Sequence, residues 1–128
     1  MGLYIGMLAV NLIIPVTMLI SGAFMYKNPL GKPNAYAGYR SRRSRMNQDT
    51  WNFAQEYCGK LWIRAGAVLM ALAVIIQLIF INAGDEALAN YTLACVSVEC
   101  VAMLATIWPV EFALKRTFDE NGNRREVR

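Results

Sequence analysis

Three long apolar runs constrain the fold of this chain more than any other feature of its sequence. They lie at residues 3–25, 61–81 and 91–112. A helix rises about 1.5 Å per residue, so about 18 or more apolar residues can cross the roughly 30 Å of hydrocarbon in a bilayer. Only 17% of the 128 residues are charged, which is too few for the polar shell of a soluble domain. The runs therefore predict an all-α integral membrane protein with three transmembrane helices.

The first run has an alternative interpretation as a cleaved signal peptide. Its small residues Ser21, Gly22 and Ala23 loosely resemble a cleavage site. However, no basic residue precedes the run, and it is longer than the roughly 7 to 15 residues of a signal-peptide core. We therefore expect a retained span and a single membrane domain over residues 1–128.

The basic residues are distributed unevenly, and this asymmetry predicts the orientation of the chain. All 13 Lys and Arg residues lie in or beside the loop at 26–60 or in the tail at 113–128, whereas the short loop at 82–90 carries two acidic residues and no basic one. Lys and Arg are retained on the cytoplasmic side of membranes. We therefore expect a multi-pass protein with its N-terminus outside and its C-terminus in the cytoplasm.

Four arginines are crowded into six positions of the long loop, between residues 40 and 45. A role in topology, helped by attraction to anionic lipid headgroups, accounts for such a cluster. A nucleic-acid patch would need an exposed basic domain, and a loop fixed at both ends offers little room for one. We expect the lipid bilayer as a partner and no direct contact with nucleic acid.

The second half of the loop is predicted to form a short amphipathic cytoplasmic helix at about 47–60, between the first and second spans. Asn47 can supply the N-cap oxygen. One apolar stripe follows at spacings of three, four and three residues: Trp51, Ala54, Cys58 and Leu61. A helix with a tryptophan on its apolar side suits the membrane interface. The alternative, a helix packed against the bases of the spans, stays open, and the two interpretations can coexist.

The same region carries a resemblance to a known family. The matching pattern in the loop is Gly38, Tyr39, Arg40, Ser41, Ser44, Asn47, Trp51 and Ala54. A second match lies in the tail, at Pro109, Glu111, Leu114, Phe118, Asp119, Gly122 and Asn123. Together they resemble the signature of the SdpI family of bacterial membrane proteins, with a serine at position 41 where the family has threonine. The named immunity protein has further membrane helices before this module, and we expect this chain to be essentially the module alone.

The resemblance implies a place in the bacterial cytoplasmic membrane and a role in immunity. The family's best-known member protects a producing cell from its own secreted toxic peptide and is thought to hold a repressor at the membrane. The implied partners are therefore a peptide toxin or a cytoplasmic regulator. A small structural or accessory subunit of a membrane complex or transporter is the alternative. Self-association is compatible with either, because three spans leave most of the helical surface facing lipid.

An intramembrane binding site is predicted from the residues themselves. Glu99 lies near the middle of the third run, where a carboxyl group that faces lipid costs several kcal/mol and should face protein or water instead. Seams of small and polar residues on the other two runs place Asn11 and Gln77 in the same outer half of the bundle. The three side chains could line a pocket that opens outward for a peptide, lipid or ion. Alternatively, they only hold the helices together by hydrogen bonds, with Glu99 protonated.

A second polar pair is predicted at the cytoplasmic side. Arg64 lies one turn into the second run, and Glu111 lies near the inner end of the third. Opposite charges at similar depth would offset each other's desolvation cost, so we expect an ion pair between them. The alternative is that Arg64 extends to the lipid headgroups.

Catalysis and metal binding find little support. The chain has no histidine, and motifs for nucleophilic, phosphate-binding or zinc chemistry are absent from it. Its cysteines, Cys58, Cys95 and Cys100, lack the C-x-x-C spacing, and the last two point in divergent directions from one helix. We expect no enzymatic activity, no catalytic residue, no metal site and no cofactor.

Overall fold

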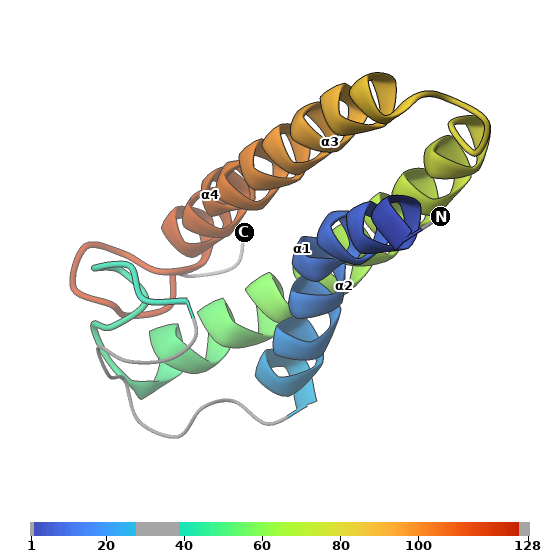
Figure 1. Ribbon diagram of the computed structural model, residues 1–128. Coiled ribbons are helices and arrows are strands. Elements are labelled where there is room, and N and C mark those ends of the chain that lie inside the picture. Colours follow the sequence, from blue (N-terminus) through green and yellow to red (C-terminus); the bar gives the residue numbers. More distant parts are fainter. Residues whose placement is uncertain (1, 28–38, 126–128) are drawn as a thin grey trace.

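The computed structural model describes residues 2–27 and 39–125, which form four helices in sequence (Figure 1). The helices are α1 (Gly2–Lys27), α2 (Gln48–Ile79), α3 (Asp85–Ala105) and α4 (Ile107–Thr117). α3 and α4 meet at Thr106 and together form one segment long and apolar enough to cross a membrane, as α1 and α2 also are. The described residues contain no β-strand. The predicted all-α architecture with three spanning segments is confirmed.

The predicted short helix before the second span is continuous with that span in α2. Its start is fixed by a capping box, in which Asn47 and Thr50 each accept a hydrogen bond from the other's backbone N–H, at 2.8 and 3.0 Å. Because these bonds satisfy amide groups that lack a partner within the helix, α2 begins where the sequence predicts.

The predicted apolar stripe of α2 lies on its inner side. Ala54 and Cys58 belong to the buried core, and Leu61 packs against that core. The side chain of Trp51 is 0% exposed. Burial against the rest of the protein therefore explains the stripe, because a tryptophan that anchors the helix in the membrane interface would be exposed on the surface.

α1 and α2 pack closely, and their closest approach is at two glycines. A Cβ atom added at Gly22 would lie 2.7 Å from the carbonyl oxygen of Gly59, and one added at Gly59 would lie 2.6 Å from that of Gly22. Farther along the same interface, a Cβ at Gly66 would lie 3.0 Å from the carbonyl oxygen of Pro15. Small residues permit this separation between membrane helices, because larger side chains would hold the backbones apart.

The described part of the long loop, the start of α2 and the chain after α4 form a layer at one end of the bundle, opposite the turn between α2 and α3 (Figure 1). Its core consists of buried apolar residues from three helices and the tail: Met25, Ala54, Cys58, Val110, Leu114 and Phe118. The Asn47 side-chain amide donates to the carbonyl oxygen of Gly122 at 2.7 Å, and Arg124 donates twice to Asp49, at 2.8 and 2.9 Å. Gly122 has a φ of +81°, which a residue with a Cβ rarely adopts.

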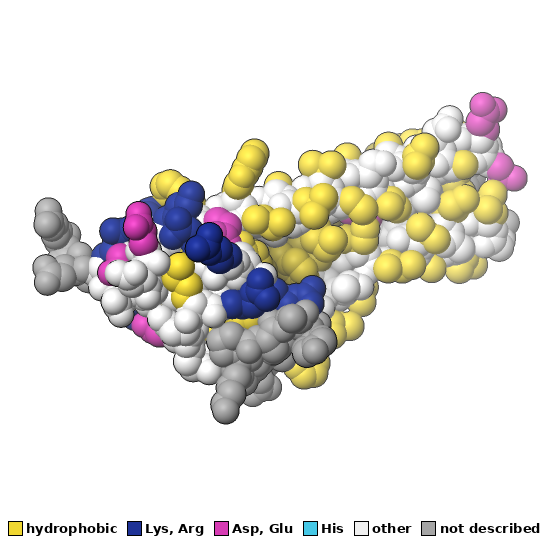
Figure 2. Space-filling view, turned by 90° about the vertical axis from the view of Figure 1, so that its left-hand side faces the viewer, with side chains coloured by type: hydrophobic (Ala, Val, Ile, Leu, Met, Phe, Trp, Pro, Cys, Tyr) yellow, Lys and Arg dark blue, Asp and Glu magenta, His cyan; other side chains and the backbone are white. Residues whose placement is uncertain are grey.

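Basic side chains gather at one end of the molecule, where some acidic side chains also lie. Figure 2 shows Lys and Arg side chains gathered at the end that carries the loop and tail, while hydrophobic side chains cover the helices. At the opposite end acidic side chains are in view without basic ones, and this end carries Asp85 and Glu86 at the start of α3. The molecule therefore has one basic end and one acidic end, separated by an apolar body.

Candidate functional site

Two of the predicted intramembrane site residues are bonded to each other. The Asn11 side-chain amide donates to Gln77 Oε1 at 2.7 Å, and the Gln77 amide donates to the carbonyl oxygen of Tyr4 at 2.9 Å. The Tyr4 hydroxyl donates back to the carbonyl oxygen of Gln77 at 2.8 Å. The structure thus places a polar bridge between α1 and α2.

Glu99 does not join this bridge. Its side chain is 2% exposed, and neither carboxylate oxygen has a hydrogen-bond partner among the described residues. Asn11 Oδ1 and the Thr92 hydroxyl are also buried without a partner in that part of the chain. The structure therefore brings Asn11 and Gln77 together but forms no hydrogen bond from Glu99 to either. A ligand-binding role for the three residues stays a prediction.

Glu111 in α4 is contacted by the long loop. The Tyr39 hydroxyl donates to Glu111 Oε1 at 2.5 Å, and Arg43 Nε lies 4.0 Å from Glu111 Oε2. Arg64 is exposed and takes part in neither of the two ion pairs of the described residues. The predicted pair between Arg64 and Glu111 is therefore wrong. The loop brings its own cation, Arg43, to the carboxylate, and Arg64 is exposed on the surface of α2.

The position of Tyr39 is fixed on both sides of its peptide unit by Gln55 of α2. The backbone N–H of Tyr39 donates to Gln55 Oε1 at 2.8 Å, and the Gln55 amide donates to the carbonyl oxygen of Tyr39 at 2.6 Å. Gln55, which the sequence pattern did not indicate as a site residue, is fully buried. It follows Trp51 by four residues and so lies on the same helical face, and this spacing could have identified it.

The remaining motif residues support the same segment. Ser44 is buried, and its hydroxyl donates to the carbonyl oxygen of Ser41 at 2.8 Å. Asn47 caps α2 and contacts the tail, as described above. Arg40 is exposed, whereas Gly38 lies outside the described residues. Most of the motif therefore holds the loop in place, and Arg40 is exposed in the segment that the others fix.

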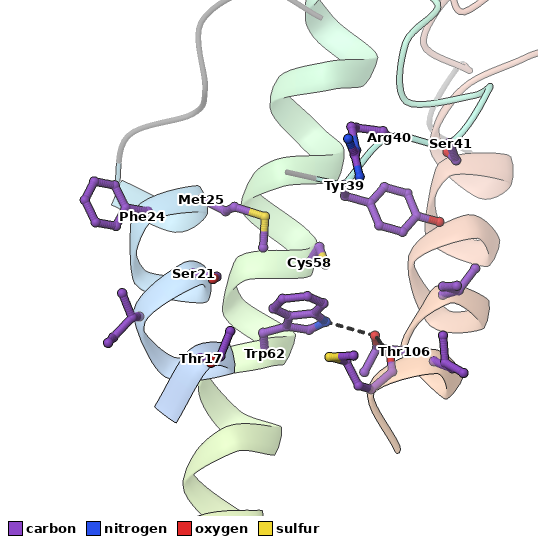
Figure 3. A pocket seen from close by; sticks show the side chains of 14 residues that line it. Thr17, Ser21, Phe24, Met25, Tyr39, Arg40, Ser41, Cys58, Trp62 and Thr106 are labelled. Atoms are coloured by element: carbon purple, nitrogen blue, oxygen red, sulfur yellow. Dashed lines mark hydrogen bonds between the residues drawn. The ribbon is translucent and has the colours of Figure 1, made fainter. Parts of the chain in front are cut away.

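The segment of residues 39–41 closes one end of a cavity of about 720 Å³ (Figure 3). The walls come from α1, α2, the end of α3 and the start of α4. Trp62 crosses the deeper part of the space, where its indole N–H donates to the Thr106 hydroxyl at 2.9 Å. Most of the lining is apolar, with few polar groups. These properties are typical of a ligand pocket, for which about 300–1,000 Å³ is the usual size.

The cysteines of the described residues do not form a site. Cys58 is buried and Cys95 and Cys100 are partly exposed, and all three are free thiols. Within residues 2–27 and 39–125, no group of three or more Cys, Asp or Glu side chains could hold a metal ion. The absence of an enzymatic activity stays a prediction.

Comparison with known proteins identifies the family. Residues 31–110, more than half of the chain, match the sequence model of the SdpI/YfhL protein family. The chain belongs to this family. A similar curated protein is the uncharacterized protein YfhL of Bacillus subtilis strain 168, which is 34% identical over 59 residues, or 46% of this chain and 54% of that protein. The chain thus matches about half the length of this family member. No solved structure matches it.

The family match includes part of the candidate site and leaves out α1 and Glu111. It covers the segment of residues 39–41, all of α2 and α3, and the start of α4. Ser44, one of the residues that carry the resemblance in the loop, helps to fix this segment over the cavity, together with Gln55 and Glu111. The structure thus connects the family signature to a defined place in the molecule.

Proposed function

We propose that this SdpI/YfhL family protein is an immunity protein that binds a membrane-inserted toxic peptide and so protects the cell. Its membership of the family and its three membrane-spanning segments support this proposal. The observation that carries it is the apolar cavity closed by the segment of residues 39–41. A peptide that inserts in a bilayer exposes apolar side chains, and a preformed apolar space of this size can receive several of them.

We infer further that the basic end of the molecule lies in the cytoplasm and the acidic end outside. The support is the separation of charge between the two ends, since Lys and Arg are retained on the cytoplasmic side. The cavity then opens in the cytoplasmic half of a bacterial membrane, where a bilayer-spanning peptide reaches it. An occupied cavity would displace the loop at its mouth, and a cytoplasmic regulator could bind the displaced loop.

A complementation experiment tests the proposal. A bacterium that lacks its SdpI-family immunity protein is transformed with this chain or with the empty vector, and survival is measured in medium from a peptide-producing culture. We expect survival with the chain and killing with the vector. Equal killing, with the chain present in the membrane at normal levels, would reject immunity and favour the role of an accessory subunit, which copurification with a membrane complex would then identify.

A further inference from the structure

The cavity is closed at one end by the segment of residues 39–41 and is open at its side toward the lipid. Three of its lining residues also face outward, since Ile20, Phe24 and Leu104 are 57%, 61% and 62% exposed. Ile20 and Phe24 belong to α1 and Leu104 to α3, so the gap between these helices connects the cavity with the surface that faces hydrocarbon. An empty space would lose the dispersion contacts of every atom that lines it. In a bilayer, an acyl chain is the molecule available to fill it.

The one charged side chain in the lining, Arg40, lies at one end of the cavity, and the rest of the lining is mostly apolar, with Thr17, Ser21 and Thr106 among it. Figure 3 shows Tyr39, Arg40 and Ser41 together at one end, with Trp62 and Thr106 farther along the space. The first end is also the end of the bundle at which Lys and Arg side chains gather. It therefore lies at the level of the headgroups, and the rest of the cavity extends into the hydrocarbon. Arg40 is exposed at this mouth while it also contributes to the lining.

We propose that the cavity is a binding site for an anionic phospholipid of the surrounding bilayer. One acyl chain lies between α1 and the α3–α4 junction, and the phosphate contacts the guanidinium of Arg40. The order of the lining, with a cation at the interface and apolar side chains below it, is the order of groups along a phospholipid. A guanidinium donates two parallel hydrogen bonds to phosphate oxygens. In phosphatidylcholine the choline cation neutralises the charge of the phosphate, so a guanidinium is attracted more strongly to an anionic headgroup. The lipid occupies the cavity when no peptide is bound, and an incoming peptide would displace it. Binding of the lipid does not depend on the proposed protective function.

Quenching of tryptophan fluorescence by brominated lipid tests this site, because bromine acts over short distances and Trp62 lines the cavity. The full chain carries Trp108→Phe, which removes a tryptophan that is 81% exposed to lipid anyway. Vesicles of phosphatidylcholine contain a small fraction of either brominated phosphatidylglycerol or brominated phosphatidylcholine. The same protein with Trp62→Phe gives the signal of the buried Trp51 alone, and the difference between the two proteins reports on the cavity.

We expect brominated phosphatidylglycerol to quench Trp62 at a lower fraction than brominated phosphatidylcholine does. Arg40→Gln should weaken this preference about fivefold, the effect of one basic residue near an anionic surface. Arg45→Gln removes an exposed arginine outside the cavity, is the matched control and should leave the preference unchanged. Arg40→Lys keeps the positive charge and should still prefer phosphatidylglycerol. Equal quenching by the two lipids, no quenching of Trp62, or equal effects of Arg40→Gln and Arg45→Gln would each overturn the proposal. Helix content by circular dichroism establishes that each variant is folded.

Discussion

The hydroxyl of Tyr39 donates a hydrogen bond to the carboxylate of Glu111 across 72 positions of the sequence. This bond connects the long loop to α4, and Gln55 connects the same tyrosine to α2. Tyr39 therefore holds three parts of the chain together at the basic end of the bundle. Its burial, followed by the hydrogen bond to Glu111 and the charge of that carboxylate, raises the pKa of Tyr39 above its ordinary value.

Tyr39→Phe should reduce stability and change its dependence on alkaline pH. Loss of the hydrogen bond to Glu111 should lower the free energy of unfolding in detergent by about 1 kcal/mol at neutral pH. Because the pKa of Tyr39 is higher in the folded protein than in the unfolded chain, its contribution is complete below about pH 10. Above that pH the unfolded chain loses the proton first, so stability falls as the pH rises.

The pH series is measured by denaturant or thermal unfolding of the intact protein, of Tyr39→Phe and of Tyr57→Phe. Tyr57 is exposed and stacks on Phe53, a contact that phenylalanine preserves. We expect a shallower alkaline decline for Tyr39→Phe than for the other two proteins. Identical declines in all three would show that the hydroxyl of Tyr39 does not contribute to folding.

Gly22→Ala should weaken the packing of α1 on α2. The added methyl group would lie 2.7 Å from the carbonyl oxygen of Gly59, so the helices must separate, at a cost of about 1–3 kcal/mol in the free energy of unfolding. Gly6→Ala is the matched control in the same helix, since no atom lies within 4 Å of a Cβ there. Thermal unfolding of both variants checks this, and equal stabilities would contradict a close glycine contact between the helices.

Glu99→Leu should not destabilise the protein. Neither oxygen of Glu99 has a partner among the described residues, so leucine removes a buried polar group without depriving Asn11 or Gln77 of a hydrogen bond. We expect an unchanged melting temperature or a gain of about 1 kcal/mol in stability. In contrast, Gln77→Leu should lose about 1 kcal/mol, because it removes the bridge to Asn11. A Glu99→Leu variant that unfolds more easily than Gln77→Leu would contradict this assignment.

The proposed orientation predicts opposite locations for two points in the chain. A reporter fused after Gly84 should lie outside the cytoplasm, and one fused after Arg128 should lie inside it, because the basic end stays in the cytoplasm. Paired fusions to an enzyme active only outside and a fluorescent protein active only inside provide the measurement. The same compartment for both positions would mean that the segments do not cross the membrane three times.

The spanning segments could be predicted from the sequence because backbone polar groups that face lipid must be hydrogen-bonded within their own segment. A long apolar run in a membrane therefore forms an α-helix. The start of α2 could also be predicted, since Asn47 and Thr50 act within three residues of each other. Local sequence carries the information in both cases. The family resemblance is likewise confirmed, by the match of residues 31–110 to the family model, and the loop part of its motif lies in one continuous stretch of sequence.

The partners of Glu111 could not be predicted in the same way. Depth in the membrane placed Arg64 and Glu111 at similar levels, but the loop supplies Tyr39 and Arg43 at that level too. Whether Arg43 or Arg64 reaches the carboxylate depends on the folded path of the loop, and the periodicity of the sequence carries no information about that path. The cavity was missed for a related reason, since it is formed by four helices and a loop segment whose separation is set by packing.

The central claim, that the cavity binds the toxic peptide, is tested most directly by the toxin resistance of cells whose protein has its cavity filled by a larger side chain. Ser21 lines the cavity from α1, and Ser21→Phe would occupy the space that a ligand needs. Ile13→Phe adds an aromatic ring to an exposed position of the same helix outside the cavity and is the matched control. With equal amounts of folded protein in the membrane, we predict that Ser21→Phe lowers survival in toxin-containing medium to that of the empty vector, while Ile13→Phe retains full protection. Full protection by Ser21→Phe would contradict the account.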